Sequence, residues 1–213
     1  MPELTAVVNG GRPYFLFTGR LEKIKGVQVI IPVLRERPDV DLLIAGSGDF
    51  EAPLRAMASG AANIQFLGRV DHHRLQLLYR GALATLVPSL CYETFGLVVA
   101  ESFSAGTPVI VHAQSSLAEI VSTHGGGAMY RDTPELRAAI DALHTDAGLR
   151  LRLGRQGRAA YEAEFAEDAF LRHYLAVVHA LLAKKRTGEP ATAVTDGRPQ
   201  LLAGRAVLVG QDS

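Results

Sequence analysis

The sequence predicts a doubly wound α/β fold, in which helices cover both faces of a mostly parallel, Rossmann-like sheet. Short apolar runs alternate with longer amphipathic stretches nearly from end to end of the chain. Six of these alternations are typical of a strand followed by a loop and a helix, the repeating unit of a parallel sheet with crossover helices. The 213 residues are enough for a single large domain of this kind.

The expected elements follow the apolar runs in order. The first strand is expected at 14–17, and further strands are expected at 41–45, 64–67, 82–87, 108–111 and 128–130, because each is a short continuous apolar run. The stretches after the first five strands predict helices at about 26–36, 50–59, 71–80, 96–105 and 115–122. Three further helices, at about 133–145, 147–164 and 167–184, close the fold.

The composition excludes several classes of protein. Lys plus Arg equals Asp plus Glu, at 22 each, so no net basic charge attracts nucleic acid or anionic lipid. Cys91 is the single cysteine, which excludes an internal disulfide and a multi-cysteine zinc site. The apolar runs are far shorter than the roughly 20 residues that cross a bilayer, and the first residues lack the features of a signal peptide. We therefore expect a cytoplasmic protein without a transmembrane segment and without a nucleic-acid partner.

Changes in composition divide the chain into three expected parts. Residues 1–12 form a lead-in, and residues 13–186 contain the expected strands and helices. Residues 187–213 are expected to form a flexible tail, because they begin with a run rich in Thr, Gly, Pro and Ala. Within this tail, residues 201–209 regain apolar character, which fits a stray strand, a segment that docks onto a partner, or disorder.

Ligands of doubly wound folds bind outside the carboxyl ends of the strands, so chemistry is expected in the loops that follow the strands. The loop after the first strand contains Gly19, Arg20 and Lys25. A glycine lets the backbone turn tightly, an arginine binds two phosphate oxygens at once, and a lysine adds a mobile positive charge. Arg20 and Lys25 together suit a diphosphate, although two isolated basic residues are more often solvated surface charges.

The loop after the fourth strand carries the most informative pattern. It runs from Pro88 into a helix that is expected to begin near Phe95 or Gly96. The first N–H groups of such a helix and its dipole favour a phosphate, and a glycine permits close approach. Glu101 lies about 7.5 Å further along the helix axis, an offset that allows its carboxylate to bind a ribose while the helix end holds phosphate. Glu93 would lie on the other side of the phosphates, although two such glutamates are more often plain helix and loop charges.

Several spaced motifs combine over about residues 13–122, and the closing helices extend the match to about residue 184. The motifs are Gly19-Arg20-Leu21 with Lys25-Gly26, Phe66-Leu67-Gly68, Pro88-Ser89, Glu93-x-Phe95-Gly96-Leu97 with Glu101, Gly106-Thr107-Pro108-Val109-Ile110, and Glu119-Ile120-Val121. In this order and at this spacing they resemble the donor-binding, C-terminal half of a retaining GT-B glycosyltransferase of family 4, the group 1 glycosyl transferases.

The resemblance implies a role for each matching residue. Arg20, Lys25 and Glu93 would be catalytic: the two cations hold the diphosphate and stabilise its charge as it leaves, and Glu93 binds a hydroxyl of the donor sugar. Glu101 would bind the ribose. The remaining donor-binding residues would be Gly19 in the first loop, Arg69 and Val70 near the base, and Phe95, Gly96 and Leu97, whose backbone N–H groups reach the phosphates.

The resemblance also implies what the chemistry uses and what it needs from elsewhere. The donor would be a nucleotide-diphosphate sugar, linked to UDP, GDP or ADP, and no metal or other cofactor would take part. The acceptor would attack from the face that the phosphate leaves, and this same-face mechanism would replace the mechanism with two carboxylates that hydrolases use. An N-terminal acceptor-binding domain would be missing from this chain or supplied by a partner, so the isolated chain would be inactive. Any association with a membrane would come through that missing half.

Two other hypotheses stay open. The chain could be a non-catalytic nucleotide-sugar-binding or assembly module that docks onto a partner chain through its last helix or its tail. A nucleotide-sugar epimerase shares the overall architecture, but it would need acid and base residues from the missing half.

Other patterns favour ordinary structure. Asp39-Val40-Asp41 resembles a metal-binding Asp-x-Asp signature, but it precedes a strand instead of following one. Gly46-Ser47-Gly48 begins like a dinucleotide-binding fingerprint, but Glu51 stands where the third glycine belongs, so a tight turn into a helix is expected. The pair His72-His73 is expected to open a helix in solvent.

One loop departs from the family pattern. Members often carry a Gly-Gly pair before the glutamate that matches Glu119, whereas this chain reads Gln114-Ser115-Ser116. The serine hydroxyls are expected to cap the following helix, but contacts from this loop to a donor sugar become uncertain.

Overall fold

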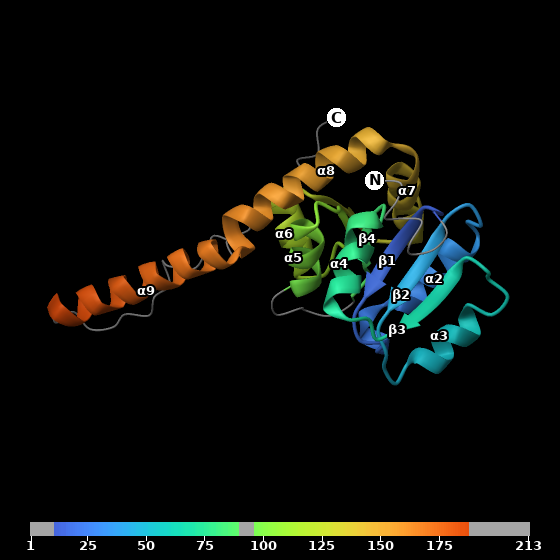
Figure 1. The fold of residues 1–213 in the computed structure, drawn as a ribbon, viewed down its shortest axis with the longest axis horizontal. Helices are drawn as coiled ribbons and strands as arrows, with labels where there is room; N and C mark the ends of the chain where they lie inside the picture. The colour runs from blue at the N-terminus through green and yellow to red at the C-terminus, as the bar shows by residue number, and fades with distance from the viewer. Residues whose placement is uncertain (1–10, 90–95, 188–213) are drawn as a thin grey trace, which may run out of the picture. The chain divides into compact units, whose positions relative to one another are not determined.

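The computed structural model describes residues 11–89 and 96–187 and confirms the doubly wound α/β fold (Figure 1). The chain divides into two compact units, Met1–Phe165 and Ala166–Ser213. The strands of the first unit are β1 (Tyr14–Thr18), β2 (Asp41–Ala45), β3 (Ile64–Gly68), β4 (Thr85–Val87), β5 (Val109–His112) and β6 (Gly127–Tyr130). Its helices are α2 (Val27–Arg35), α3 (Glu51–Met57), α4 (His72–Gly81), α5 (Leu97–Ser104), α6 (Leu117–His124), α7 (Thr133–Thr145) and α8 (Ala147–Ala160).

The strands form one parallel sheet in the order β3-β2-β1-β4-β5-β6. From β1 the chain proceeds outward to β2 and β3, then returns to the other side of β1 and proceeds outward again through β4, β5 and β6. The order therefore reverses between β1 and β4. In open α/β sheets the ligand crevice lies at this reversal, outside the carboxyl ends of the strands.

Two apolar layers cover the central strands, because alternate side chains of a strand point to opposite faces of the sheet. Phe15 and Phe17 belong to a buried cluster that also contains side chains of α2 and α7. Tyr14 and Leu16 belong to a second buried cluster on the other face, which contains Leu78 and Tyr79 of α4. The two faces are thus filled by different helices, and the carboxyl edge of the sheet is left for the loops.

The helix expected at about 26–36 is α2, and a 3₁₀ turn (Lys23–Lys25) precedes it, with Gly26 between them at a left-handed φ of 75°. Two expected boundaries were wrong, each for a local reason. The strand expected at 82–87 begins only at Thr85, because α4 extends to Gly81 and the N–H of Ala82 bonds back to Tyr79. The helix expected at 147–164 ends at Ala160, where one π-helical turn (Tyr161–Phe165) follows.

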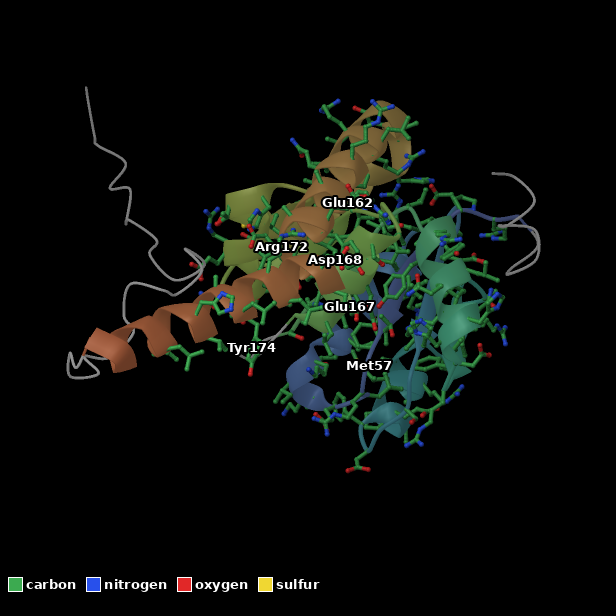
Figure 2. All side chains as sticks on the ribbon, turned by 60° about the vertical axis from the view of Figure 1, so that its left-hand side comes forward. Met57, Glu162, Glu167, Asp168, Arg172 and Tyr174 are labelled. Carbon is green, nitrogen blue, oxygen red and sulfur yellow. The ribbon has the colours of Figure 1, made fainter. Side chains whose placement is uncertain are left out.

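The second unit is described by the helix α9 (Glu167–Thr187). Figure 2 shows the side chains of Glu167, Asp168, Arg172 and Tyr174 along its first turns. Glu167 and Asp168 place negative charge at the positive end of the helix dipole, which stabilises the helix start. Among the residues that the structure describes, none of the helices combines the length and the apolar character needed to cross a bilayer.

Candidate functional site

Two adjoining cavities lie at the carboxyl edge of the sheet and share Thr18, Gly19 and Arg20. The larger has a volume of about 640 Å³, and the loops after β1, β2 and β3 line it. The smaller has a volume of about 110 Å³ and lies between the end of β1 and the start of α5, with Lys25, Ser89 and Val98 in its wall. The pair therefore straddles the point where the strand order reverses.

Backbone contacts hold the first two loops together beneath the larger cavity. The N–H of Gly19 donates to Ala45 O at 3.0 Å, and the N–H of Leu21 donates to Ser47 O at 3.0 Å. Gly46 has a φ of 149° and packs so closely on the carbonyl of Gly19 that a Cβ would overlap it. The first glycine of Gly46-Ser47-Gly48 is thus required by the packing of two loops in a tight turn, as expected.

A second close approach joins the first loop to the loop after β4. Gly26 has a φ of 75°, and a Cβ on it would fall inside the carbonyl oxygen of Pro88. This contact brings Lys25 and Ser89 to the same small cavity. Backbone packing therefore helps to position Lys25 and Ser89 at this cavity.

The predicted basic residues are in the cleft. Arg20 is 74% exposed and forms a 2.8 Å ion pair with Glu22, which also lines the larger cavity. Lys25 is partly buried in the wall of the smaller cavity. A guanidinium and an ammonium that converge on one cavity form an anion-binding arrangement, since an arginine binds phosphate oxygens in pairs.

The far end of the larger cavity is formed by the loop after β3. Arg69 and Val70, which the resemblance places near a base, line it. The Nε of Arg69 donates to Ser47 Oγ at 3.0 Å, which ties this loop to the loop after β2. Ser47 and Asp49 are lining residues that the sequence reasoning missed, because the Gly-x-Gly pattern around them was interpreted as a turn alone.

Helix α5 begins at the smaller cavity. Gly96 caps it with a left-handed φ of 61°, and a Cβ there would press against Leu117 and Ile120. Val98, in the first turn, lines the cavity. The first N–H groups of a helix have no intrahelical partner, so this end of α5 offers donors and a positive dipole to an anion.

Glu101 lies one turn beyond Val98 on the same face of α5. It is partly buried, and its Oε2 accepts a 2.7 Å hydrogen bond from the hydroxyl of Tyr79 on α4. Burial raises the pKa of the Tyr79 phenol far above its ordinary value, and the adjacent Glu101 carboxylate raises it further. The phenol therefore stays protonated and always acts as the donor.

The structure separates the predicted residues into three groups. Those that line the cavities are Gly19, Arg20, Lys25, Arg69 and Val70. Gly96, Leu97 and Glu101 are not among the described lining residues, but they belong to the helix that borders the smaller cavity. Glu93 and Phe95 lie outside the described residues. The roles assigned to all of these residues stay predictions.

The patterns that were set aside lie away from the cleft or serve the fold. Asp41 opens β2 at the amino edge of the sheet, where it is buried and its Oδ1 accepts from Arg12 Nε at 2.8 Å. His72 and His73 open α4 and are exposed, as expected. Within residues 11–89 and 96–187, the structure shows no group of three or more His, Cys, Asp or Glu side chains arranged to hold a metal ion.

The expected cap of α6 was wrong. Ser116 is the N-cap residue, but it makes no side-chain cap hydrogen bond, because its φ and ψ of −59° and −22° are already helical. Ser115 Oγ instead donates back to His112 O at 2.7 Å and closes the preceding turn. This loop is therefore anchored to the end of β5.

Comparison with known proteins agrees with this geometry. The sequence model of the family described as Glycosyl transferases group 1 matches residues 6–160. The chain belongs to this family. An uncharacterized glycosyltransferase of Methanocaldococcus jannaschii is 36% identical over 151 residues, which are 67% of this chain and 38% of that protein.

Two further proteins illustrate the range of the family. A GDP-mannose-dependent monoacylated alpha-(1-6)-phosphatidylinositol monomannoside mannosyltransferase of Corynebacterium glutamicum is 31% identical over 166 residues, which are 72% of this chain and 44% of that protein. The structure of sucrose-phosphate synthase from Thermosynechococcus elongatus superposes with a TM-score of 0.74 at 28% identity, over 86% of this chain and 49% of that one. The group 1 chain thus spans less than half the length of each of these relatives.

Proposed function

We propose that this chain binds the nucleotide-diphosphate sugar for a retaining, metal-independent glycosyl transfer, and that a separate acceptor-binding domain supplies the other half of the catalyst. The observation that carries the proposal is the pair of adjoining cavities at the strand-order reversal, with Arg20 in both and Lys25 in the smaller one. Family membership supports the reaction class.

The dimensions of the cleft suit the donor. Small-molecule pockets measure about 300–1,000 Å³, and the larger cavity, at about 640 Å³, falls within this range. A nucleoside placed there would have its base against Arg69 and Val70. Its diphosphate would then reach the shared wall at Arg20 and enter the smaller cavity beside Lys25 and the first turn of α5. The sugar would lie beyond, toward the loop that contains Glu93.

The cations account for catalysis in this arrangement. As the bond between the sugar and the diphosphate breaks, negative charge grows on the leaving oxygen. Preorganised positive groups at that position lower the barrier, since they interact more strongly with the developing charge than with the ground state. Arg20, Lys25 and the N–H groups of α5 would supply this stabilisation, which is why we assign no metal to the reaction.

In the proposal, the position of these groups accounts for retention of configuration at the transferred sugar. The leaving diphosphate stays bound on one face of the sugar, where it can receive the proton of an acceptor hydroxyl that attacks from the same face. The acceptor-binding domain would come from sequence beyond this chain, as the family relatives are more than twice as long as the region they share with it. A single cysteine suits a reducing cytoplasm as the place of the reaction.

Calorimetric titration with UDP, GDP and ADP tests the proposal. At least one of the three should bind, and the Arg20→Ala variant should bind it about tenfold more weakly. This loss is the lower end of what a hydrogen bond to a charged group contributes, and we expect the lower end because Arg20 is largely exposed. Binding should be the same in Mg²⁺ and in EDTA.

A matched variant controls for loss of charge alone. Arg80 is an exposed arginine in the last turn of α4, at the opposite edge of the sheet from the cleft. Arg80→Ala changes the net charge by the same amount as Arg20→Ala and should leave the affinity unchanged. Failure of the protein to bind any of the three diphosphates, or equal losses in the two variants, would refute the proposal.

A further inference from the structure

The hydroxyl of Tyr79 lies between the cleft and Glu101. It donates to Glu101 Oε2 at 2.7 Å and also has a side-chain hydrogen bond with Thr18. Thr18 ends β1 and lines both cavities. One buried phenol therefore links the carboxyl end of the central strand to the carboxylate on α5.

The direction of the hydrogen bond between Tyr79 and Glu101 is fixed. The phenol is fully buried, and its protonated state makes it a donor to the carboxylate of Glu101. Burial raises the phenol pKa most and the Glu101 carboxylate raises it further, whereas the contact with Thr18 lowers it by less. Tyr79 thus donates to Glu101.

Buried hydroxyl groups hold the backbone next to Tyr79 and next to Glu101. Thr107 Oγ1 donates to Tyr79 O at 2.6 Å, which fixes the end of α4. The side chain of Ser102, next to Glu101, lies 2.8 Å from Thr85 Oγ1 and donates to Thr107 O at 2.9 Å. With the two helices anchored in this way, the remaining freedom at Glu101 is that of its side-chain torsions.

We propose that Tyr79 is the positioning residue for the ribose-binding carboxylate, and that it thereby sets the preference of the cleft for ribonucleotides over deoxyribonucleotides. Its hydroxyl occupies Oε2 of Glu101, so the carboxylate is held in one orientation with Oε1 left to accept from a ribose hydroxyl. This inference rests on the proposed function of the cleft. Without the phenol hydroxyl, Glu101 would sample several rotamers, and a ribose would have to order it on binding.

A comparison of two ligands isolates this effect. The wild-type protein is titrated with the diphosphates UDP, GDP and ADP and with the 2′,3′-dideoxy form of the one that binds, which lacks the hydroxyl groups that Glu101 would contact. The wild type should bind the dideoxy form at least tenfold more weakly. Tyr79→Phe should reduce this ratio by roughly three- to tenfold, mainly by weakening the binding of the ribonucleotide, because a ribose must then order the Glu101 side chain when it binds.

A second tyrosine, on strand β1, offers a matched control because its hydroxyl bonds to the same helix. Tyr14 is also fully buried, and its hydroxyl donates to Leu78 O of α4 at 2.8 Å, one residue from Tyr79. Tyr14→Phe removes a buried phenol hydroxyl from the same cluster without touching Glu101. It should destabilise the fold and leave the ribose ratio unchanged.

A double variant separates positioning from packing. In a Glu101→Gln background, Tyr79→Phe should change the ribose ratio no further, because the two side chains act as one unit. If Tyr79→Phe does not fold, NMR of the wild type replaces it: the slowly exchanging hydroxyl proton of Tyr79 should shift when the ribonucleotide binds and shift less with the dideoxy form.

The outcomes separate the two claims. No binding of any diphosphate by the wild type would overturn the proposed function and this inference with it. Binding with an unchanged ribose ratio in Tyr79→Phe, or an equal change in Tyr14→Phe, would overturn the inference and leave the proposed function standing. In the NMR experiment, equal hydroxyl shifts with both ligands would overturn the inference in the same way.

Discussion

The close approach of Gly26 to Pro88 predicts a large and separable effect for Gly26→Ala. The left-handed conformation of Gly26 costs an alanine about 1–2 kcal/mol. The new methyl group would also overlap the carbonyl oxygen of Pro88, a backbone atom that cannot rotate away, and overpacking of this kind costs about 1–3 kcal/mol. Together these effects lower the free energy of unfolding by about 2–5 kcal/mol, or the melting temperature by roughly 4–20 °C for a chain of this size.

Gly106→Ala provides the reference for the backbone contribution. Gly106 has a nearly identical φ of 71°, but a Cβ on it would meet nothing within 4 Å. Its substitution should therefore cost only the conformational part, about 1–2 kcal/mol. Both variants lose the same unfolded-state freedom, so the difference between them measures the contact with Pro88 alone.

The same substitution should disturb the cleft. To relieve the overlap, the loop that contains Lys25 must move away from the loop that contains Ser89, and these residues line one small cavity. We expect Gly26→Ala to weaken binding of the best nucleoside diphosphate about tenfold, and Gly106→Ala to leave it unchanged. Urea unfolding and calorimetry measure the two effects. Equal losses of stability in the two variants would show that the loops are not held by this contact.

Three further predictions concern single charges and the tyrosines. Glu22→Gln should strengthen diphosphate binding up to about fivefold, because it releases Arg20 from an exposed ion pair worth at most about 1 kcal/mol. A weaker affinity of this variant by calorimetry would contradict the prediction. Asp41→Asn should lower the free energy of unfolding by about 1–3 kcal/mol without changing diphosphate affinity, since its partner Arg12 lies at the opposite edge of the sheet; a loss of affinity would argue against that separation. Loss of stability at alkaline pH should begin near pH 10, where the phenols ionise in the unfolded chain, because burial raises the folded-state pKa values of Tyr14, Tyr79 and Tyr130. The stability that these phenols contribute is therefore present below pH 10 and is lost as the pH rises above it. Urea unfolding at pH 8 to 11 should show this loss, and a Tyr→Phe substitution at any of the three positions should reduce it.

Features that depend on neighbours in the sequence could be predicted from it. The six strands are continuous apolar runs, and the loop with Gly19, Arg20 and Lys25 follows the first of them directly. Since ligand-binding loops of doubly wound sheets follow the strand ends, the position of this loop in the cleft required only the order of elements. The family could be identified for the same reason, because its motifs are short and their spacing is regular.

Features that depend on packing between distant segments could not be predicted. The hydrogen bond from Tyr79 to Glu101 joins two helices that approach each other only when both pack on the sheet. Gly46 and Gly26 are required by contacts with Gly19 and Pro88, which lie on other loops. Local reasoning assigned Gly46 to a turn and Gly26 to the start of a helix, and it gave no reason to select one tyrosine among six.

The most direct test of the account is a crystal structure of the chain with the nucleoside diphosphate that binds most tightly. The account predicts the phosphates within hydrogen-bond distance of Arg20, Lys25 and the first N–H groups of α5, with the ribose hydroxyls on Glu101 and the base beside Val70. A nucleotide bound elsewhere on the chain, or phosphates that contact neither Arg20 nor Lys25, would contradict it.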